Sequence, residues 1–123
     1  MKETILVVED GDAVRNLVCV MLVENGYRVL EAVDGEDAIR VWREHAGEID
    51  LLFSDMVMPK GISGLDLATR FKTDRPDLKV VITSGYSVDL TSERVLSGPG
   101  VVFLAKPYFV DGLLKVLREC LES

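Results

Sequence analysis

The chain has 123 residues, 48% of them hydrophobic, and a formal net charge of −7 at pH 7. This size and composition fit one compact domain. The acidic charge argues against direct binding to nucleic acid or to an anionic membrane, both of which require basic patches, and favours a partner with a basic surface.

The hydropathy of the chain and its cysteines indicate the cellular compartment of the protein. The longest apolar run, 17–23, is far shorter than the roughly 18 residues of a membrane helix, and the N-terminus lacks the apolar stretch of a signal peptide. Cys19 and Cys120 have no second cysteine or histidine at metal-ligand spacing, and two thiols do not make a disulfide framework. We therefore expect a soluble, cytoplasmic protein with reduced thiols.

Five short apolar segments alternate with five helix-like segments, a pattern typical of a single α/β unit. The predicted strands are Ile5 to Val8, Tyr27 to Ala32, Leu51 to Phe53, Val80 to Ile82 and Val101 to Leu104. Four of them are continuously apolar, as expected for parallel strands that are covered on both faces. The second contains Arg28 and Glu31, which indicates an edge strand with one side toward water.

The first helix is predicted from apolar spacing, and Asn25-Gly26 supplies its left-handed stop. Its expected buried stripe consists of Val14, Leu17, Val18, Met21 and Leu22. On the opposite side we expect Cys19, Val20 and Val23 to form an exposed apolar patch close to the acidic residues that follow the first strand.

Capping residues mark the start of two later helices. Asp34 precedes the second helix with Asp37 three residues on, and Ser63 stands in the same relation to Asp66 before the third. The fourth segment, Asp89 to Leu96, is weakly patterned, so it is the element we expect to shift with the functional state. The fifth helix is predicted to bury a stripe of Val110, Leu113, Leu114, Leu117 and Leu121.

Polar side chains stand where the apolar strands end. Glu9 and Asp10 follow the first strand, Asp55 follows the third, Thr83 ends the fourth, and Lys106 follows the fifth. The carboxyl ends of parallel strands meet at one edge of a sheet, where ligands bind. We therefore expect these side chains to share one shallow cup.

The acidic trio at this edge predicts a cation site. Glu9 and Asp10 stand where a dinucleotide-binding fold has its glycine-rich turn, and two acids there would repel phosphates. Their oxygens suit a hard divalent cation such as Mg²⁺. Two carboxylates about 4 Å apart repel by about 4 kcal/mol at an effective dielectric constant of about 20. With Asp55 as its third member, the trio is expected to bind a cation or to hold a proton.

An ammonium and a hydroxyl group complete the predicted site. Pro107 disfavours the α conformation for Lys106, whose ammonium is placed to pair with Asp55 and with an anion attached to it. Thr83 offers a hydroxyl to the same anion. A carboxylate flanked by a divalent cation, a lysine and a threonine is equipped to accept a phosphoryl group as an aspartyl phosphate.

With these residues in view, the whole chain resembles the receiver domain of two-component response regulators. The motifs at the family's spacing are Glu9-Asp10, Asp55 with Met58-Pro59, Thr83-Ser84-Gly85, Phe103 and Lys106-Pro107. The resemblance implies one receiver domain over residues 1–123. It also implies the α/β fold class, a doubly wound, flavodoxin-like (βα)5 domain whose parallel five-stranded sheet has the order 2-1-3-4-5.

The resemblance assigns roles in phosphorylation and switching. Asp55 would be the phosphoacceptor, and Lys106 and Thr83 would hold the phosphoryl oxygens. In the family the threonine moves toward the phosphate and an aromatic residue, here Phe103, turns inward behind it. The surface of the fourth helix, fifth strand and fifth helix changes as a result. Phe103 lacks the hydroxyl of the tyrosine that is common at this position.

The resemblance also implies a metal site. Mg²⁺, or Mn²⁺ in its place, would be held by Asp10, Asp55 and the backbone carbonyl of Val57, with Glu9 acting mainly through a bound water. Glu9 is one methylene longer than the aspartate often found there, which can alter metal affinity without removing the ligand.

The implied partners are a histidine kinase or a histidine phosphotransfer domain. In the family the first helix commonly docks such donors, so Val20 and Val23 are candidate docking residues. We expect no direct contact with nucleic acid or membrane, and a phosphorylation-dependent dimer is compatible with the resemblance. The chain ends soon after the fifth helix, so we expect no output domain here and no enzyme activity beyond self-phosphorylation and slow self-dephosphorylation.

Several functional interpretations stay open at this point. The loops Pro59 to Gly64 and Thr83 to Ser87 resemble those of receivers in hybrid sensor histidine kinases, which favours that origin. A stand-alone single-domain response regulator and a contact-only scaffold are the alternatives. A phosphatase of the haloacid dehalogenase type requires an aspartate two residues after the nucleophile, where this chain has Val57.

Overall fold

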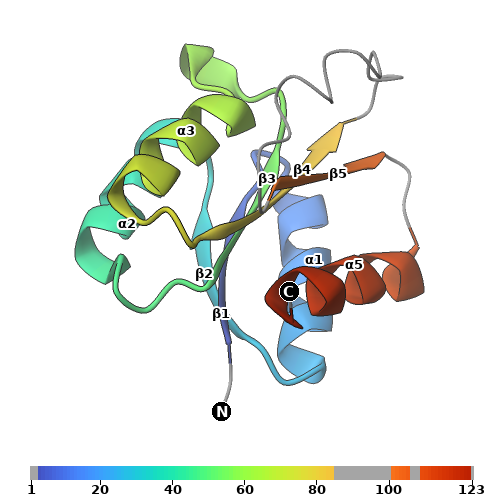
Figure 1. The fold of residues 1–123 in the computed structure, drawn as a ribbon. Helices are drawn as coiled ribbons and strands as arrows, with labels where there is room; N and C mark the ends of the chain where they lie inside the picture. The colour runs from blue at the N-terminus through green and yellow to red at the C-terminus, as the bar shows by residue number, and fades with distance from the viewer. Residues whose placement is uncertain (1–2, 85–100, 106–108, 123) are drawn as a thin grey trace.

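The structure is a computed structural model that describes residues 3–84, 101–105 and 109–122. Five parallel strands form one sheet of order β2-β1-β3-β4-β5 (Figure 1). The strands are β1 (Thr4–Val8), β2 (Arg28–Ala32), β3 (Leu51–Asp55), β4 (Lys79–Ser84) and β5 (Val101–Ala105). The α/β class and the order 2-1-3-4-5 are therefore confirmed, and β2 is an edge strand with Arg28 and Glu31 exposed, as predicted.

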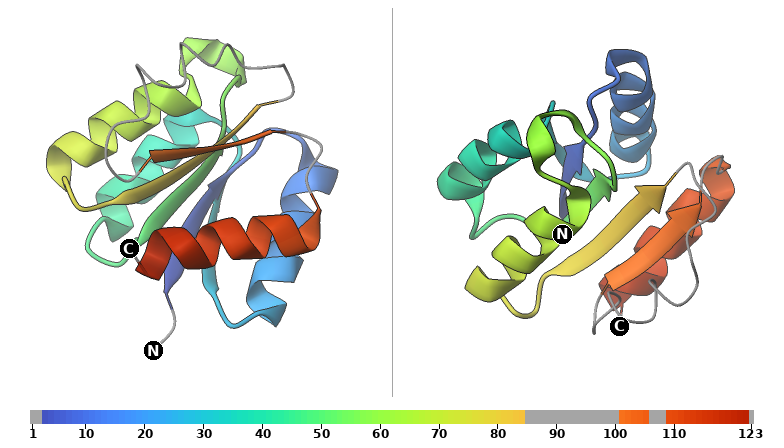
Figure 2. Two further views of the ribbon diagram at one scale, coloured as in Figure 1. Left: turned by 45° about the vertical axis from the view of Figure 1, so that its right-hand side comes forward. Right: turned by 90° about the horizontal axis from the view of Figure 1, so that it is seen from above.

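Helices cover both faces of the sheet. Figure 2 shows α1 and α5 on one face and α2 and α3 on the other. The described helices are α1 (Asp12–Glu24), α2 (Gly35–His45), α3 (Gly64–Asp74) and α5 (Val110–Glu122), with a short 3-10 turn η1 (Pro59–Gly61). The weakly patterned segment Asp89 to Leu96 lies outside the described residues. Within the described part of the chain, no helix has the length and hydropathy needed to cross a membrane.

The continuous apolar character of the strands follows from this two-sided cover. In β1, Leu6 and Val8 pack into the core under α2 and α3, while Ile5 and Val7 pack into the core under α1 and α5. All four side chains are buried. A strand that is dry on both sides has no position for a polar residue until it leaves the sheet, so its first polar residues mark the edge where sites form.

The predicted capping residues are confirmed. The Asp34 side chain accepts a hydrogen bond from the Asp37 backbone N–H at 2.8 Å. At α3, Ser63 and Asp66 form a reciprocal capping box. Each cap satisfies backbone N–H groups that have no partner inside the helix and so defines where the helix begins.

The predicted buried face of α1 is partly wrong. Leu17 is 68% exposed and Val14 is 43% exposed, whereas Cys19, which was expected to face outward, is buried. Apolar residues occur on nearly every side of this helix, so spacing alone fits more than one orientation. The core selects the face centred on Val18 and Leu22. Burial raises the pKa of Cys19 to about 12, so its thiol stays protonated at neutral pH.

The stripe of α5 needs one correction. Val110, predicted to be buried, is half exposed because it is the first residue of the helix. Leu113 and Leu117 are buried as predicted, and Cys120 adds a further buried residue near the end of the same helix.

The α2 and α3 helices are joined by an aromatic pair. The rings of Trp42 and Phe71 stack with centroids 4.3 Å apart, and Trp42 Nε1 donates a hydrogen bond to Asp74 Oδ2 at 2.9 Å. Both ring systems are buried. This contact holds α3, whose first residue lies beside Asp55, against the neighbouring helix.

Candidate functional site

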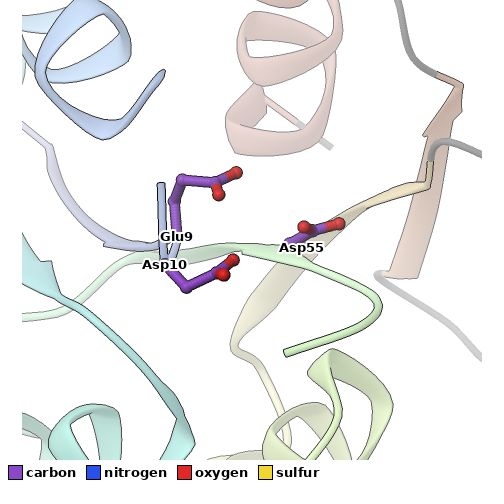
Figure 3. Close-up of side chains that lie close together, drawn as sticks. All are labelled: Glu9, Asp10 and Asp55. Atoms are coloured by element: carbon purple, nitrogen blue, oxygen red, sulfur yellow. The ribbon is translucent and has the colours of Figure 1, made fainter. Parts of the chain in front are cut away.

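Three carboxyl groups meet where β1 and β3 end. The two strands are neighbours, with Val8 opposite Ser54, so the residues that follow them emerge side by side. One oxygen from each of Glu9, Asp10 and Asp55 lies within 4.8 Å of the other two. Figure 3 shows the carboxyl groups of Glu9 and Asp10 turned toward the end of β3 that carries Asp55. Glu9 and Asp55 are half-buried and Asp10 is exposed, so the cluster is open to a ligand from solvent.

The arrangement fits a hard divalent cation. Three carboxylates at this spacing repel one another strongly when all are ionised, and a divalent cation among them reverses the sign of that energy. All donors in the cluster are oxygens, which Mg²⁺ prefers. Because Asp10 is exposed, a bound Mg²⁺ would remain accessible to water, several molecules of which it usually keeps.

The backbone around Glu9 is held by three hydrogen bonds. Its N–H donates to the carbonyl of Ala32, the last residue of β2, at 3.2 Å. Its Oε2 accepts from the Gly11 N–H at 2.9 Å, and its carbonyl accepts from Arg15 Nη1 at 3.0 Å. The acidic pair thus lies in a turn tied to both β2 and the first turn of α1.

Arg15 is not among the residues that the sequence predicts for this site. Its Nη2 donates to Asp12 Oδ1 at 2.7 Å, and its Nε donates to Glu31 Oε1 at 3.2 Å. The hydrogen bond with Asp12 is the main reason that the pKa of Arg15 is raised above its ordinary value. The Asp12/Arg15 spacing of three residues was a visible signal for a helical ion pair. The contacts with Glu9 and Glu31 depend on the fold.

The end of β3 is fixed by close backbone contacts. The Met56 N–H donates to the Thr83 carbonyl at 2.7 Å, and the Gly64 N–H donates to the Met56 carbonyl at 2.9 Å. Ser54 Oγ donates to the Asp55 carbonyl at 2.9 Å. Gly64 lies so close that a Cβ on it would be 2.4 Å from the same carbonyl oxygen. The strand end that carries Asp55 is therefore held by contacts with both β4 and the start of α3.

The loop after β3 is anchored to the start of α2. Lys60, which has a positive φ of 68°, places its Nζ 3.3 Å from Asp34 Oδ2 and 3.7 Å from Glu36 Oε2. The pKa of Asp34 is lowered, first because the Asp37 backbone N–H donates to it and then because of Lys60. Since the cap and the ion pair share one carboxylate, this loop and α2 are held together.

Some of the other predicted site residues are described by the structure, and some lie outside its described part. Thr83 is buried and lies directly opposite Asp55 in the β3/β4 register. Phe103 is half-buried on β5 against the core under α2 and α3, and the Val57 side chain is 61% exposed. Lys106 and Pro107 lie outside the described residues.

Val20 and Val23 are exposed on α1, at 56% and 57%. Together with Cys19, Val29 and two carboxylates, those of Glu24 and Glu31, they line an open groove of about 310 Å³ between α1 and β2. The expectation that the patch lies close to the acidic cluster is wrong for Val23. It stands eleven residues after Asp12, which is about 16 Å along the helix.

Comparisons with known proteins show the family of this chain. A family model described as the response regulator receiver domain matches residues 5–118. The sensor kinase CckA of Brucella abortus (strain 2308) is 36% identical over 120 residues, which are 98% of this chain and 13% of CckA. The DNA-binding transcriptional regulator NtrC of Azospirillum brasilense is 33% identical over 121 residues, 98% of this chain and 24% of NtrC. This chain therefore spans only a small part of these curated relatives.

A solved structure gives the same result in three dimensions. The crystal structure of the receiver domain from the hybrid histidine kinase CckA is similar with a TM-score of 0.81 and 40% sequence identity. The match covers 96% of this chain and 98% of that domain. The matched residues 5–118 include the acidic turn after β1, the end of β3 and the strand that carries Thr83. By sequence and by fold, the chain belongs to the response regulator receiver domain family.

Proposed function

We propose that this receiver domain accepts a phosphoryl group on Asp55 from a phosphohistidine, with Mg²⁺ bound at the acidic cluster. The observation that carries the proposal is the convergence of Glu9, Asp10 and Asp55 within 4.8 Å, with Thr83 opposite Asp55 on the next strand. A metal site alone would explain the carboxylates. It would not explain a hydroxyl-bearing residue beside one of them.

The proposed chemistry assigns a task to each residue. An oxygen of Asp55 attacks phosphorus, the new P–O bond forms as the P–N bond to the donor breaks, and the electron pair stays on the imidazole. Bound Mg²⁺ would supply positive charge to the phosphoryl oxygens. Asp10, Asp55 and the Val57 carbonyl would hold the ion, with Glu9 acting through a water. Thr83 and Lys106 would donate to the same oxygens, which is the electrostatic stabilisation that such a transfer needs.

The experiment that tests this proposal is intact-mass measurement after incubation with acetyl phosphate, with and without Mg²⁺. We expect a gain of one phosphoryl group that depends on Mg²⁺ and is removed by hydroxylamine, as for an acyl phosphate. If acetyl phosphate produces no gain in mass, the domain is incubated with a phosphorylated histidine phosphotransfer domain and its mass is measured again. Failure of both donors would contradict the proposal and leave the contact-only scaffold.

Metal binding at Asp10 has its own thermal signature. Mg²⁺ at ten times its Kd should stabilise the fold by about 1.4 kcal/mol and raise the Tm by several degrees. The Asp10→Asn variant should lose this response. Its metal-free Tm should equal or exceed that of the wild type, because one of three mutually repelling charges is gone. Both are read from melting curves with and without Mg²⁺.

A matched control separates the ligand role from loss of charge. Asp77 is 82% exposed beyond the end of α3, so Asp77→Asn makes the same change in net charge away from the cluster. It should keep the full Mg²⁺ response. An Asp10→Asn protein that still gains stability from Mg²⁺ would remove Asp10 from the ligand set.

We further propose that the domain belongs to a hybrid sensor histidine kinase in the cytoplasm. Support comes from the 40% identity to the CckA receiver domain and from the loop resemblance described above. The 33% identity to NtrC supports the alternative, which is that the domain belongs to a response regulator. Cys19 and Cys120 are free cysteines, as is usual for proteins of a reducing compartment.

The exposed valines of α1 are proposed to contact the phosphodonor. Serine at both Val20 and Val23 should slow phosphoryl transfer from a phosphorylated histidine phosphotransfer domain about tenfold, which corresponds to about 1.4 kcal/mol of lost contact. Labelling by acetyl phosphate should be unchanged, because a small donor needs no docking surface. Equal loss with both donors would indicate damage to the site, and no loss with either would remove the docking role.

A further inference from the structure

The carbonyl group of Glu9 lies just beyond the strand ladder. β1 ends at Val8, which is the last residue paired with both β2 and β3. The hydrogen bond to the Glu9 carbonyl comes instead from Arg15, one turn into α1. This carbonyl belongs to the peptide that joins the two acidic residues Glu9 and Asp10. Its orientation therefore sets the backbone direction from which the Asp10 side chain leaves.

Arg15 is itself held in one position. Its three side-chain nitrogens donate to three different parts of the fold: Nη1 to the end of β1, Nη2 to Asp12 at the start of α1, and Nε to Glu31 on β2. The side chain is only 12% exposed, although it sits on the first turns of a surface helix. A guanidinium group is planar, so donors fixed at two edges also fix the direction of the third.

Charge alone would make Arg15 unfavourable at this place. A cation next to a cluster of carboxylates weakens the attraction of that cluster for Mg²⁺, even when Asp12 and Glu31 partly offset the charge. Electrostatics through space therefore predicts that removing Arg15 makes Mg²⁺ bind more tightly. The hydrogen bond to the Glu9 carbonyl predicts the opposite, because ligands that lose their outer support bind metal more weakly.

We propose that Arg15 is a positioning residue for the acidic metal site: its guanidinium fixes the Glu9–Asp10 peptide so that Asp10 keeps the orientation required to bind a divalent cation. This inference rests on the proposed Mg²⁺ site and names a residue that supports it from outside the ligand set. Arg15 does not touch the phosphoryl group in this scheme, and its effect is on metal affinity.

The test is calorimetric titration of the purified metal-free domain with Mg²⁺, for the wild type and three variants. Arg15→Gln removes the charge and the guanidinium donors. Arg15→Lys keeps the charge and loses the planar fork. Arg40→Gln is the matched control, because Arg40 also pairs with two acids, Asp37 and Glu44, but lies on α2 away from the cluster. Arg15→Gln and Arg40→Gln change the net charge equally.

We expect the Kd for Mg²⁺ to rise about tenfold in Arg15→Gln, in the range known for residues that support metal ligands. Arg15→Lys should fall between this variant and the wild type, and Arg40→Gln should match the wild type. The rate of labelling by acetyl phosphate at saturating Mg²⁺ should return to near the wild-type value in both Arg15 variants. A positioning role thus appears in the Mg²⁺ dependence and not in the maximal rate.

Two results would overturn the proposal, and they are distinguishable from each other. If the wild type binds Mg²⁺ and both Arg15 variants bind it equally well or more tightly, Arg15 has no positioning role while the metal site stands. If the wild type binds no Mg²⁺, the metal site of the proposed function fails and the role of Arg15 fails with it. Within the first result, a lower Tm of the Arg15 variants would assign Arg15 to stability alone.

Discussion

The Asp55→Asn variant is expected to lose all phosphoryl labelling while keeping its fold. Asparagine matches aspartate in shape but lacks the anionic oxygen that forms the new bond to phosphorus. Removing one of three carboxylates within 4.8 Å also relieves repulsion among them, so the metal-free variant should remain folded. Intact mass after incubation with acetyl phosphate and Mg²⁺ measures the first effect, and a thermal melt measures the second.

The result separates chemistry from folding. Asp77→Asn serves again as the control that keeps labelling, because it removes a remote, exposed carboxylate. Labelling that persists in Asp55→Asn would show that another side chain accepts the phosphoryl group. Chemical reduction of the acyl phosphate, followed by peptide mapping, would then identify the residue that accepts the phosphoryl group. A variant that neither folds nor labels would be replaced by Asp55→Glu, which keeps the charge and displaces the nucleophilic oxygen.

The Gly64→Ala variant should be destabilised by about 2 kcal/mol, a fall in Tm of roughly 6–10 °C. The first residue of α3 is packed against the end of β3, where an added Cβ would lie 2.4 Å from the Asp55 carbonyl oxygen and 3.1 Å from Ser54 Oγ. The nearest atom is a backbone oxygen, which cannot rotate away as a side chain can. Either the start of α3 or the end of β3 must therefore shift. Because Asp55 is part of that contact, the labelling rate should fall as well.

The sign of this effect is informative because helix propensity acts in the other direction. Alanine is favoured over glycine within a helix by up to about 1 kcal/mol. Gly112 in α5 has open space around its Cβ position, so Gly112→Ala should be neutral or stabilising. Thermal melts of the two variants compare their Tm values, and the difference measures the stability lost when a Cβ is added where α3 approaches β3. A stable Gly64→Ala protein with full labelling would show that this helix end can move without disturbing Asp55.

Much of the fold was predictable because one physical signal dominated each element. The strands are apolar on both faces since helices cover both faces, and the capping residues Asp34 and Ser63 act within their own first turns. The strand order came from the family resemblance, since spacing does not determine which strands pair. The buried face of α1 is predicted only in part: Val18, Met21 and Leu22 are buried as expected, but apolar side chains such as Leu17 occur on the exposed side too.

The acidic cluster was predictable for a similar reason. Glu9, Asp10 and Asp55 are the first charged residues at the ends of strands that are buried on both faces, and parallel pairing brings those ends together. The support around them was not predictable from the sequence, because it depends on contacts between distant segments. Glu31 is sixteen residues from Arg15, and Gly64 is required only because the start of α3 approaches Asp55 so closely.

The packing of Trp42 decides what optical spectroscopy can detect in this domain. Trp42 is the single tryptophan of the chain and is stacked on Phe71, with its indole N–H bonded to Asp74 near the far end of α3. Asp74 lies ten residues beyond Gly64, about 15 Å along the helix from the end of β3. Intrinsic fluorescence will therefore follow the separation of α2 from α3 during unfolding. Tryptophan fluorescence is therefore not expected to report on metal or phosphate at Asp55, and calorimetry or mass measurement is the more direct readout.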